Sequence, residues 1–491
     1  MVEARDFLSG AMIGGHSGAR FSNKRNYVYY PHVQSDKAID EWTRAELIRK
    51  SAWAYDEIGW VGGLVDNSAK WCGKLTQKAT TEDKEWNLLA DAAFERVTGS
   101  PEFFDLSGKH NWKELVKAIF SGKFRLGDCG VILASDADGS ARIKFVEGYA
   151  IGNNPEAADD DRWTDGMLLD KHGKAQKYRV LDGAGGHTDY DRANFVYFSN
   201  LVKPGMHRGL PKTFRMLSKV QDHAEIESFW SGGVKASSQL AFQIVNSKTD
   251  GSGAGGTMGA AVTRSSSSGG KGGPKGDVYT TDLDGDNKIL KMGDERIELL
   301  HDKRPAPDQV AYLDYQKRDC AAGWGLSLEA TWNWSKAGGA ITRTLLSQVQ
   351  DFVDDEQGVF LCQGGVRIRN WVIAKEEKSG RLRKCKDNAW WQHSWMFGSR
   401  KTADFAKDGR IYLEALNRGE LSPDRYHAMQ NQDVDKEDAV TIARWLKRKE
   451  QCEAVGLNVV SVFPPAPGTP VSPEVAEMRD MVETLKDNDD E

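Results

Sequence analysis

Two short stretches have the residue types and spacing of ligand-binding loops. The first, residues 251–256, reads Gly-Ser-Gly-Ala-Gly-Gly and matches the dinucleotide-binding pattern GxGxxG. In that site a strand precedes the glycines and a helix follows them, so that backbone amides and the helix dipole meet the pyrophosphate. Here a segment rich in glycine and serine continues through residue 276, and no helix is predicted to begin. We therefore interpret residues 251–276 as a flexible Gly/Ser loop that binds no cofactor.

The second stretch imitates the start of a calcium-binding loop with Asp282, Asp284 and Asp286. An EF-hand needs glycine at its sixth position and a bidentate glutamate at its twelfth. Those positions hold Asn287 and Gly293. The aspartates therefore favour an acidic turn over a metal site.

A basic segment, residues 367–386, interleaves cationic side chains with Trp371. Aromatic and cationic residues together are typical of nucleic-acid contact. The alternative is a solvated pair of strands that turns at Lys378-Ser379-Gly380, and the acids Glu376 and Glu377 favour it. The cationic residues are Arg367, Arg369, Lys375, Lys378, Arg381, Arg383, Lys384 and Lys386.

No catalytic motif stands out elsewhere in the chain. The ten histidines form no HxxxH or HxH pair, and GxSxG, GxxxxGK[ST] and HExxH are all absent. The six cysteines are scattered without a CxxC pair, which disfavours zinc and thioredoxin-type chemistry and favours buried free thiols. The sequence therefore predicts no catalytic residue, no cofactor, no metal, and no ATP hydrolysis.

Net charge and hydropathy argue against two further classes of protein. The formal net charge of −6 argues against a protein that grips nucleic acid through bulk positive charge. No stretch approaches the ~20 apolar residues that a membrane span needs. The N-terminal residues lack a basic start followed by an apolar run, so we expect a soluble protein made in the cytoplasm.

The elements that would position any site change in character along the chain. Ser35 is predicted to cap a helix that begins at Asp36, and residues 127–200 are predicted to form a small, mostly antiparallel β unit. Within that unit Asp136–Gly139 marks the turn of a hairpin. Further helices are predicted over 82–97 and 112–120, and further strands over 166–169, 176–180 and 195–198.

The stretch from Gly209 to Leu346 organises the rest of the chain. Apolar spacing predicts a helix over 211–230, and a second helical segment after Gly232-Gly233 that carries Leu240, Phe242 and Ile244. This arrangement is typical of a projecting rod with a mobile tip. Beyond the loop we predict strands near 278–281 and 297–300, and helices over 308–329, 341–353 and 421–456.

At this stretch the chain resembles the phage portal proteins of the lambda family. Gly127-Asp128-Cys129-Gly130-Val131 resembles the family's Gly-Asp strand, and Arg208-Gly209-Leu210-Pro211 is similar to its Arg-Gly-x-Pro turn before a long helix. Residues 290–295 look like its Pro-Gly-Glu stretch, with Met-Gly-Asp in place of Pro-Gly. Trp324–Glu329 stands where the family has Gly-Ile-Pro-x-Glu, without the proline. The resemblance covers roughly residues 40–460 and rests on the order of these motifs.

The resemblance implies an α+β, portal-type protomer with a helical stem, a mostly antiparallel β wing, a small α/β clip and a helical crown. The implied parts are an N-terminal arm (1–34), the wing (35–211), a stem helix (212–247), the clip with the Gly/Ser loop (248–304), a second stem helix (305–330), a tunnel loop (331–340), a return to the wing (341–420), and the crown with the C-terminal tail (421–491).

The resemblance also implies a function and a set of channel-facing residues. The protein would form a dodecameric ring at the capsid vertex, through which DNA is packaged and ejected. The partners would be the terminase large subunit, a head–tail connector or adaptor, the major capsid protein or scaffold, and double-stranded DNA held without sequence specificity. The location would be the virion, after assembly in the host cytoplasm. The channel-facing residues would be Trp332, Asn333, Trp334, Ser335 and Lys336, with Lys336 as the phosphate contact.

Two alternatives stay open at this point. One is another ring-forming head–tail connector or adaptor of the virion. The other, from a different class, is a cytoplasmic enzyme with an inserted flexible lid.

Overall fold

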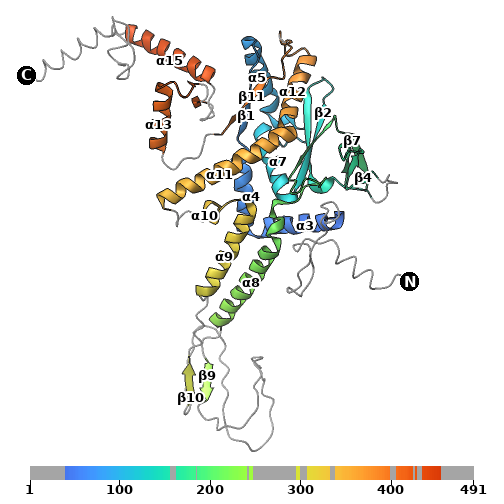
Figure 1. Ribbon diagram of the computed structural model, residues 1–491, viewed down its shortest axis with the longest axis vertical. Coiled ribbons are helices and arrows are strands. Elements are labelled where there is room, and N and C mark those ends of the chain that lie inside the picture. Colours follow the sequence, from blue (N-terminus) through green and yellow to red (C-terminus); the bar gives the residue numbers. More distant parts are fainter. Residues whose placement is uncertain are drawn as a thin grey trace, which may run out of the picture. The chain divides into compact units, whose positions relative to one another are not determined.

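The computed structural model describes residues 39–154, 162–183, 185–239, 243–246, 295–298, 307–331, 338–386, 388–398, 405–423, 426–427 and 434–454. The chain divides into two compact units (Figure 1). Unit 1 comprises Met1–Gln221 and Tyr315–Glu491, and unit 2 comprises Asp222–Asp314. Helices and antiparallel sheets are both present, which confirms the α+β expectation.

The N-terminal part of unit 1 is helical, and its helices begin at capping side chains. Asp40 accepts a hydrogen bond from the Thr43 amide at 2.8 Å, and Asn111 forms a capping box with Glu114. The first helix of the described residues therefore begins at Glu41 and is capped by Asp40, so the prediction that it begins at Asp36 with Ser35 as its cap was wrong. The helices are α3 (Glu41–Glu57), α4 (Gly59–Cys72), α5 (Lys84–Thr98), α6 (Pro101–Phe104) and α7 (Trp112–Leu126).

Two antiparallel sheets follow and confirm the predicted β unit and its hairpin. The larger has the order β3-β2-β8, and the smaller has the order β4-β5-β6-β7. Strand β2 is buried along most of its length because it is central in its sheet and packs against α7. The strands are β2 (Asp128–Ser135), β3 (Ala141–Glu147), β4 (Trp163–Thr164), β5 (Met167–Leu169), β6 (Ala175–Leu181), β7 (His187–Asp191) and β8 (Phe195–Ser199), with a short 3-10 turn η2 (Gly148–Ala150) after β3.

Farther along unit 1, the chain forms one long helical segment. Helix α11 (Gly339–Phe360) passes through a π-helical turn, η5 (Leu361–Gly365), directly into α12 (Val366–Lys378). The basic segment is therefore helical as far as Lys378 and turns at Ser379-Gly380, so the predicted turn is present but the predicted pair of strands was wrong. Its buried residues recur at helical spacing, as Ile368 and Val372 show. Beyond it, β11 (His393–Phe397) pairs antiparallel with β1 (Leu75–Ala79).

One large hydrophobic core joins these segments. Trp86, Phe124, Phe198, Trp324 and Phe360 are all less than 2 % exposed and belong to the same cluster. In Figure 1, α4, α7 and α11 come together beside the larger sheet. A separate small cluster, which includes Ile151 and Phe195, lies where the two sheets adjoin. The core therefore brings the N-terminal helices together with residues more than 200 positions later in the sequence.

The predicted rod begins with a short 3-10 turn, η3 (Lys212–Arg215), which leads into α8 (Leu217–Gln239). Helix α8 passes through Gly232-Gly233 without a break, whereas residues 243–246 form strand β9 (Gln243–Asn246), so the predicted helix over Leu240–Ile244 was wrong there. Strand β10 (Glu295–Glu298) pairs with β9 in unit 2. Residues 251–276 and 278–281 lie outside the described residues.

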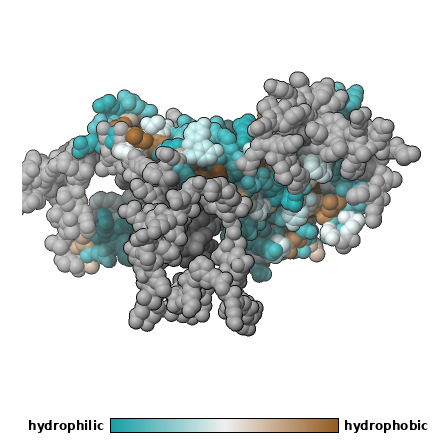
Figure 2. All heavy atoms as spheres, turned by 90° about the horizontal axis from the view of Figure 1, so that it is seen from below, coloured by the Kyte–Doolittle hydropathy of each residue, from teal (hydrophilic) through white to brown (hydrophobic). Residues whose placement is uncertain are grey.

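The second long helix of the rod, α9 (Pro307–Trp324), ends earlier than predicted. Gly325 has a φ of +96°, which terminates the helix, and a short helix α10 (Leu328–Thr331) follows. Helices α13 (Phe405–Asn417) and α15 (Val434–Ala454) form the last described part of the chain. In the part of the surface drawn in colour, Figure 2 shows mostly hydrophilic side chains with small, separate hydrophobic patches. Among the described residues, no helix is long and apolar enough to cross a membrane.

Candidate functional site

The two strongest motifs of the sequence meet at a buried ion pair. The Arg208 guanidinium donates from Nε to Oδ2 of Asp128 at 2.7 Å and from Nη2 to Oδ1 at 3.1 Å. It also donates to the carbonyl oxygens of Ile151 at 2.8 Å and Gly148 at 3.0 Å. Arg208 is 4 % exposed and Asp128 is fully buried. A buried charge is tolerated only when it is paired and hydrogen-bonded in this way.

A second arginine–aspartate pair balances the charge of the first. Asp165 accepts from both Arg208, at 3.2 Å, and Arg44 of α3, whose Nη2 lies 2.6 Å away. The network therefore holds two cations and two anions, and it ties α3 to β2 and to the β4–β5 turn. Although burial would lower the pKa of Arg208, Asp128 and Asp165 together raise it, so the guanidinium stays charged. Burial, with Asp128 nearby, raises the pKa of Tyr197, which donates to Asp128 at 2.7 Å and stays neutral.

Glycine lets the two motif segments approach each other closely. Gly127 has a φ of +91°, and a Cβ atom there would lie 2.5 Å from the carbonyl carbon of Leu210. A Cβ atom on Gly209 would lie 2.0 Å from the carbonyl oxygen of Gly127. Asn200 fastens the contact because its amide donates to the Gly127 carbonyl at 2.8 Å. The sequence Arg-Gly-Leu-Pro thus directs the backbone into η3 and then α8.

A second buried cluster lies at the start of η3. Glu356 of α11 accepts from Lys212 at 2.5 Å and from Lys123 of α7 at 3.3 Å. The Lys212 ammonium also lies 4.3 Å from the ring centre of Phe352 and 5.3 Å from that of Phe124. Burial alone would raise the pKa of Glu356, but the two lysines outweigh it and lower that pKa. The cluster joins the start of the rod to two core helices.

The cationic residues of the basic segment that point inward have protein partners. Arg369 is fully buried and donates to Gln77 at 3.2 Å and to the Trp390 carbonyl at 2.9 Å. Burial lowers the pKa of Arg369 to about 10. Arg367 donates to the Phe195 carbonyl at 3.1 Å. These two arginines therefore connect α12 to β1, to β8 and to the backbone at Trp390.

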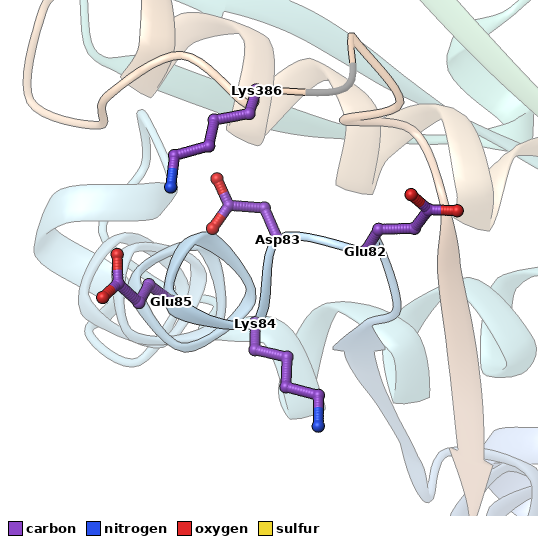
Figure 3. A pocket seen from close by; sticks show the side chains of 5 residues that line it. All are labelled: Glu82, Asp83, Lys84, Glu85 and Lys386. Carbon is purple, nitrogen blue, oxygen red and sulfur yellow. The ribbon is translucent and has the colours of Figure 1, made fainter.

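A cavity of about 430 Å³ lies at the start of α5, lined by Glu82, Asp83, Lys84, Glu85 and Lys386. Figure 3 shows the Lys386 ammonium directed toward Asp83, whereas Lys84 points away. Asp83 is already held by Arg383, whose Nη1 and Nη2 each lie 2.7 Å from it. The hydrogen bond from Arg383 holds the pKa of Asp83 well below its ordinary value. Arg383 also lies 3.6 Å from Glu85, so one arginine pairs with two of the acids that line the cavity.

The residues predicted to face the channel, Trp332–Lys336, lie outside the described residues. The described part of the chain holds no group of His, Cys, Asp and Glu side chains that could bind a metal. Both Gly127-Asp128 and Arg208–Pro211 stand out in the sequence, but nothing there indicates that Asp128 pairs with Arg208. A charged residue at the start of an otherwise apolar strand, as at Asp128, is the signal that could have suggested a buried partner.

Comparisons with known proteins identify the family. The model described as "Phage portal protein, lambda family" matches residues 31–341. No curated protein matches the chain. Similar solved structures include a chain of the neck of an empty GTA particle computed with C6 symmetry, with 11 % identity, coverage of 79 % of this chain and 93 % of that one, and a TM-score of 0.47.

Two further solved structures are similar. One is from the virion of a native gene transfer agent particle, with 11 % identity, 79 % and 93 % coverage, and a TM-score of 0.42. The other is from the neck of a native GTA particle computed with C12 symmetry, with 10 % identity, 80 % and 94 % coverage, and a TM-score of 0.47. The family assignment rests on the family model, whose match spans more than half of the 491 residues and includes both motif segments of the buried junction. The chain belongs to the lambda family of phage portal proteins.

Proposed function

We propose that the chain is the subunit of a ring-shaped portal at the capsid vertex, a conduit through which DNA is packaged and later ejected. The observation that carries the proposal is the family match over residues 31–341, which contains the Asp128–Arg208 junction. That junction holds segments of the proposed wing together where α8 begins. A ring that bears the force of DNA packaging needs a rigid connection between its wing and its stem. The proposed ring is dodecameric.

Each proposed part of the portal is assigned to a range of residues. Residues 35–211 and 341–420 form the wing, α8 and α9 form the stem, residues 248–304 form the clip, and residues 421–491 form the crown and tail. The clip is the proposed docking site for the terminase large subunit during packaging and for a head–tail connector afterwards. The major capsid protein or scaffold is a further proposed partner, and host cytoplasm is the proposed place of assembly.

The proposed channel residues are Trp332, Asn333, Trp334, Ser335 and Lys336. Lys336 is proposed to contact phosphate, whereas the net charge of −6 keeps the rest of the ring from holding DNA tightly. The proposed role is not enzymatic. ATP hydrolysis is assigned to the separate terminase, because the sequence contains no GxxxxGK[ST] loop.

Oligomer mass tests the proposal most directly. The purified full chain is expected to have a mass in solution several times its 54.5 kDa and to form closed rings in electron micrographs. A chain that stays monomeric at micromolar concentration would overturn the proposal and favour the enzyme with an inserted lid. With rings established, Lys336→Ala is expected to impair DNA packaging while leaving ring formation intact. Rings that dock on a preassembled portal without themselves supporting packaging would instead favour the connector.

A further inference from the structure

The cluster around Glu356 contains one cation more than it contains anions. Lys212, Lys123 and Glu356 are 17 %, 1 % and 13 % exposed at their side chains, so none of them is fully solvated. One carboxylate therefore serves two ammonium groups. In the interior such an excess charge is costly, and aromatic faces can offset part of that cost through their quadrupoles.

The aromatic faces gather around Lys212 more than around Lys123. The Lys212 ammonium lies 4.3, 5.3 and 5.9 Å from the ring centres of Phe352, Phe124 and Trp324. The Lys123 ammonium lies over one ring, that of Phe120, at 5.7 Å. Lys212 thus contacts α7 through Phe124, the end of α9 through Trp324, and α11 through Phe352 and Glu356.

These contacts lie close to the places where the chain crosses between the two units. The chain leaves unit 1 after Gln221 and re-enters it at Tyr315. Lys212 precedes the first crossing by nine positions, and Trp324 follows the second by nine. Between them, Lys219 of α8 forms an ion pair with Asp319 of α9. Lys212 therefore connects the turn that leads into α8 and the end of α9 to helix α11.

We propose that Lys212 is a coupling residue, which makes the start of α8, the end of α9 and helix α11 move as one body. Its ion pair with Glu356 and its three aromatic neighbours supply the connection. Lys123, which shares Glu356 but lies on α7, has no part in that coupling. The inference concerns this chain's own helices and can be tested whether or not the proposed portal function holds.

Because the cluster has two lysines and one glutamate, either lysine can be replaced without leaving Glu356 unpaired, which gives two matched variants. Lys212→Met and Lys123→Met each remove one cation, keep a long apolar stem, and leave Glu356 with one lysine in a neutral pair. Both variants are therefore expected to fold. Glu356→Gln leaves two cations without an anion and is expected to be much less stable, so it is unsuitable as the test.

Hydrogen exchange on the purified full chain separates the two methionine variants. In Lys212→Met, amides of residues 213–221 and of the second half of α11 are expected to exchange about tenfold faster. These segments can then open locally without breaking the contacts that Lys212 makes with its neighbouring helices. In Lys123→Met the same amides are expected to keep their protection to within about twofold. Lys212→Arg is expected to restore most of the protection.

Two results would overturn the coupling role. The first is equal protection in wild type and Lys212→Met over residues 213–221. The second is an increase in exchange that is the same in both methionine variants, which would show that the cluster acts only through overall stability. Neither result depends on ring assembly, so failure of the coupling role and failure of the portal proposal are distinguishable.

Discussion

The guanidinium of Arg208 holds both carboxylate oxygens of Asp128, a residue 80 positions earlier in the chain, at 2.7 and 3.1 Å. The pair lies out of contact with water and sits between the larger sheet and the segment that leads into α8. In this chain the Gly-Asp and Arg-Gly-Leu-Pro segments therefore meet one shared structural requirement. A buried charge needs a paired opposite charge, and Asp128 and Arg208 supply one to each other.

Breaking this pair should be costly. Asp128→Asn is expected to reduce the free energy of unfolding by about 3–5 kcal/mol, because it leaves the buried Arg208 guanidinium without its main counter-charge. Urea denaturation followed by tryptophan fluorescence measures the change. The matched control is Lys177→Ala, which removes the exposed pair with Asp191 at 3.7 Å and should cost about 0–1 kcal/mol. Similar costs for both variants would contradict the buried-network account.

The close approach of the motif segments can be tested with alanine. Gly209→Ala is expected to lower the free energy of unfolding by about 3 kcal/mol, because its Cβ would overlap the Gly127 carbonyl oxygen. Gly108→Ala is the control: its φ of +65° is strained for alanine, but nothing lies within 4 Å of the added Cβ. That variant should cost only about 1 kcal/mol. Thermal unfolding followed by circular dichroism compares the two, and equal shifts would exclude the overlap as the cause.

Acid should weaken the Glu356 cluster in a defined direction. The pKa of Glu356 is lower in the folded protein than its ordinary value of 4.5, so its contribution to stability is fully present above that value. It is lost as the pH falls through the folded pKa. In Lys212→Met one of the two lysines that lower this pKa is gone, so the loss should begin at a higher pH. Urea midpoints measured from pH 7 to pH 3 test this, and parallel curves for the two proteins would count against it.

Helix α8 should gain from the removal of a glycine. Gly232 lies within the helix, has no positive φ, and has nothing within 4 Å of an added Cβ. Gly232→Ala is therefore expected to stabilise the helix by about 1 kcal/mol. Slower hydrogen exchange of the neighbouring α8 amides would report this gain. Faster exchange would mean that the helix needs flexibility at this position or makes a contact there in an assembly.

The Gly/Ser loop is expected to be dispensable for assembly. Deleting residues 251–276 should leave ring formation intact, since a chain of glycine and serine buries little surface. Solution mass and micrographs of the deletion variant measure this, with the full chain as reference. Loss of rings on deletion would show that the loop has a structural role.

Local signals in the sequence predicted much of unit 1. The hairpin of β2 and β3 follows from apolar strands around the turn at Asp136–Gly139, and the helix predicted over 112–120 is α7, which continues to Leu126. These features depend on residues close together in the chain, so a single sequence reveals them.

Other features depended on distant residues and could not be read locally. Val366 to Arg369 alternates apolar and polar side chains, as in a strand, but the segment is a helix that continues from α11, and its Arg369 has buried partners. Gly232-Gly233 was predicted to break a helix, yet α8 continues through it. Within the buried junction, the partner of Arg208 could not be predicted because Asp128 is 80 positions away.

The π-helical turn at Leu361–Gly365 fixes the register of everything that follows it. Such a turn is an α-helix with one residue too many, and its Gly364 and Gly365 have no space for a Cβ atom beside Val196 and Phe360. The turn absorbs that extra residue, so α12 keeps the rotation about the helix axis that buries Arg369 and Glu376. Loss of one codon within the turn would therefore leave α12 in register. Loss of one codon at the start of α12 would instead rotate the rest of that helix by about 100° and turn Glu376 out of the core.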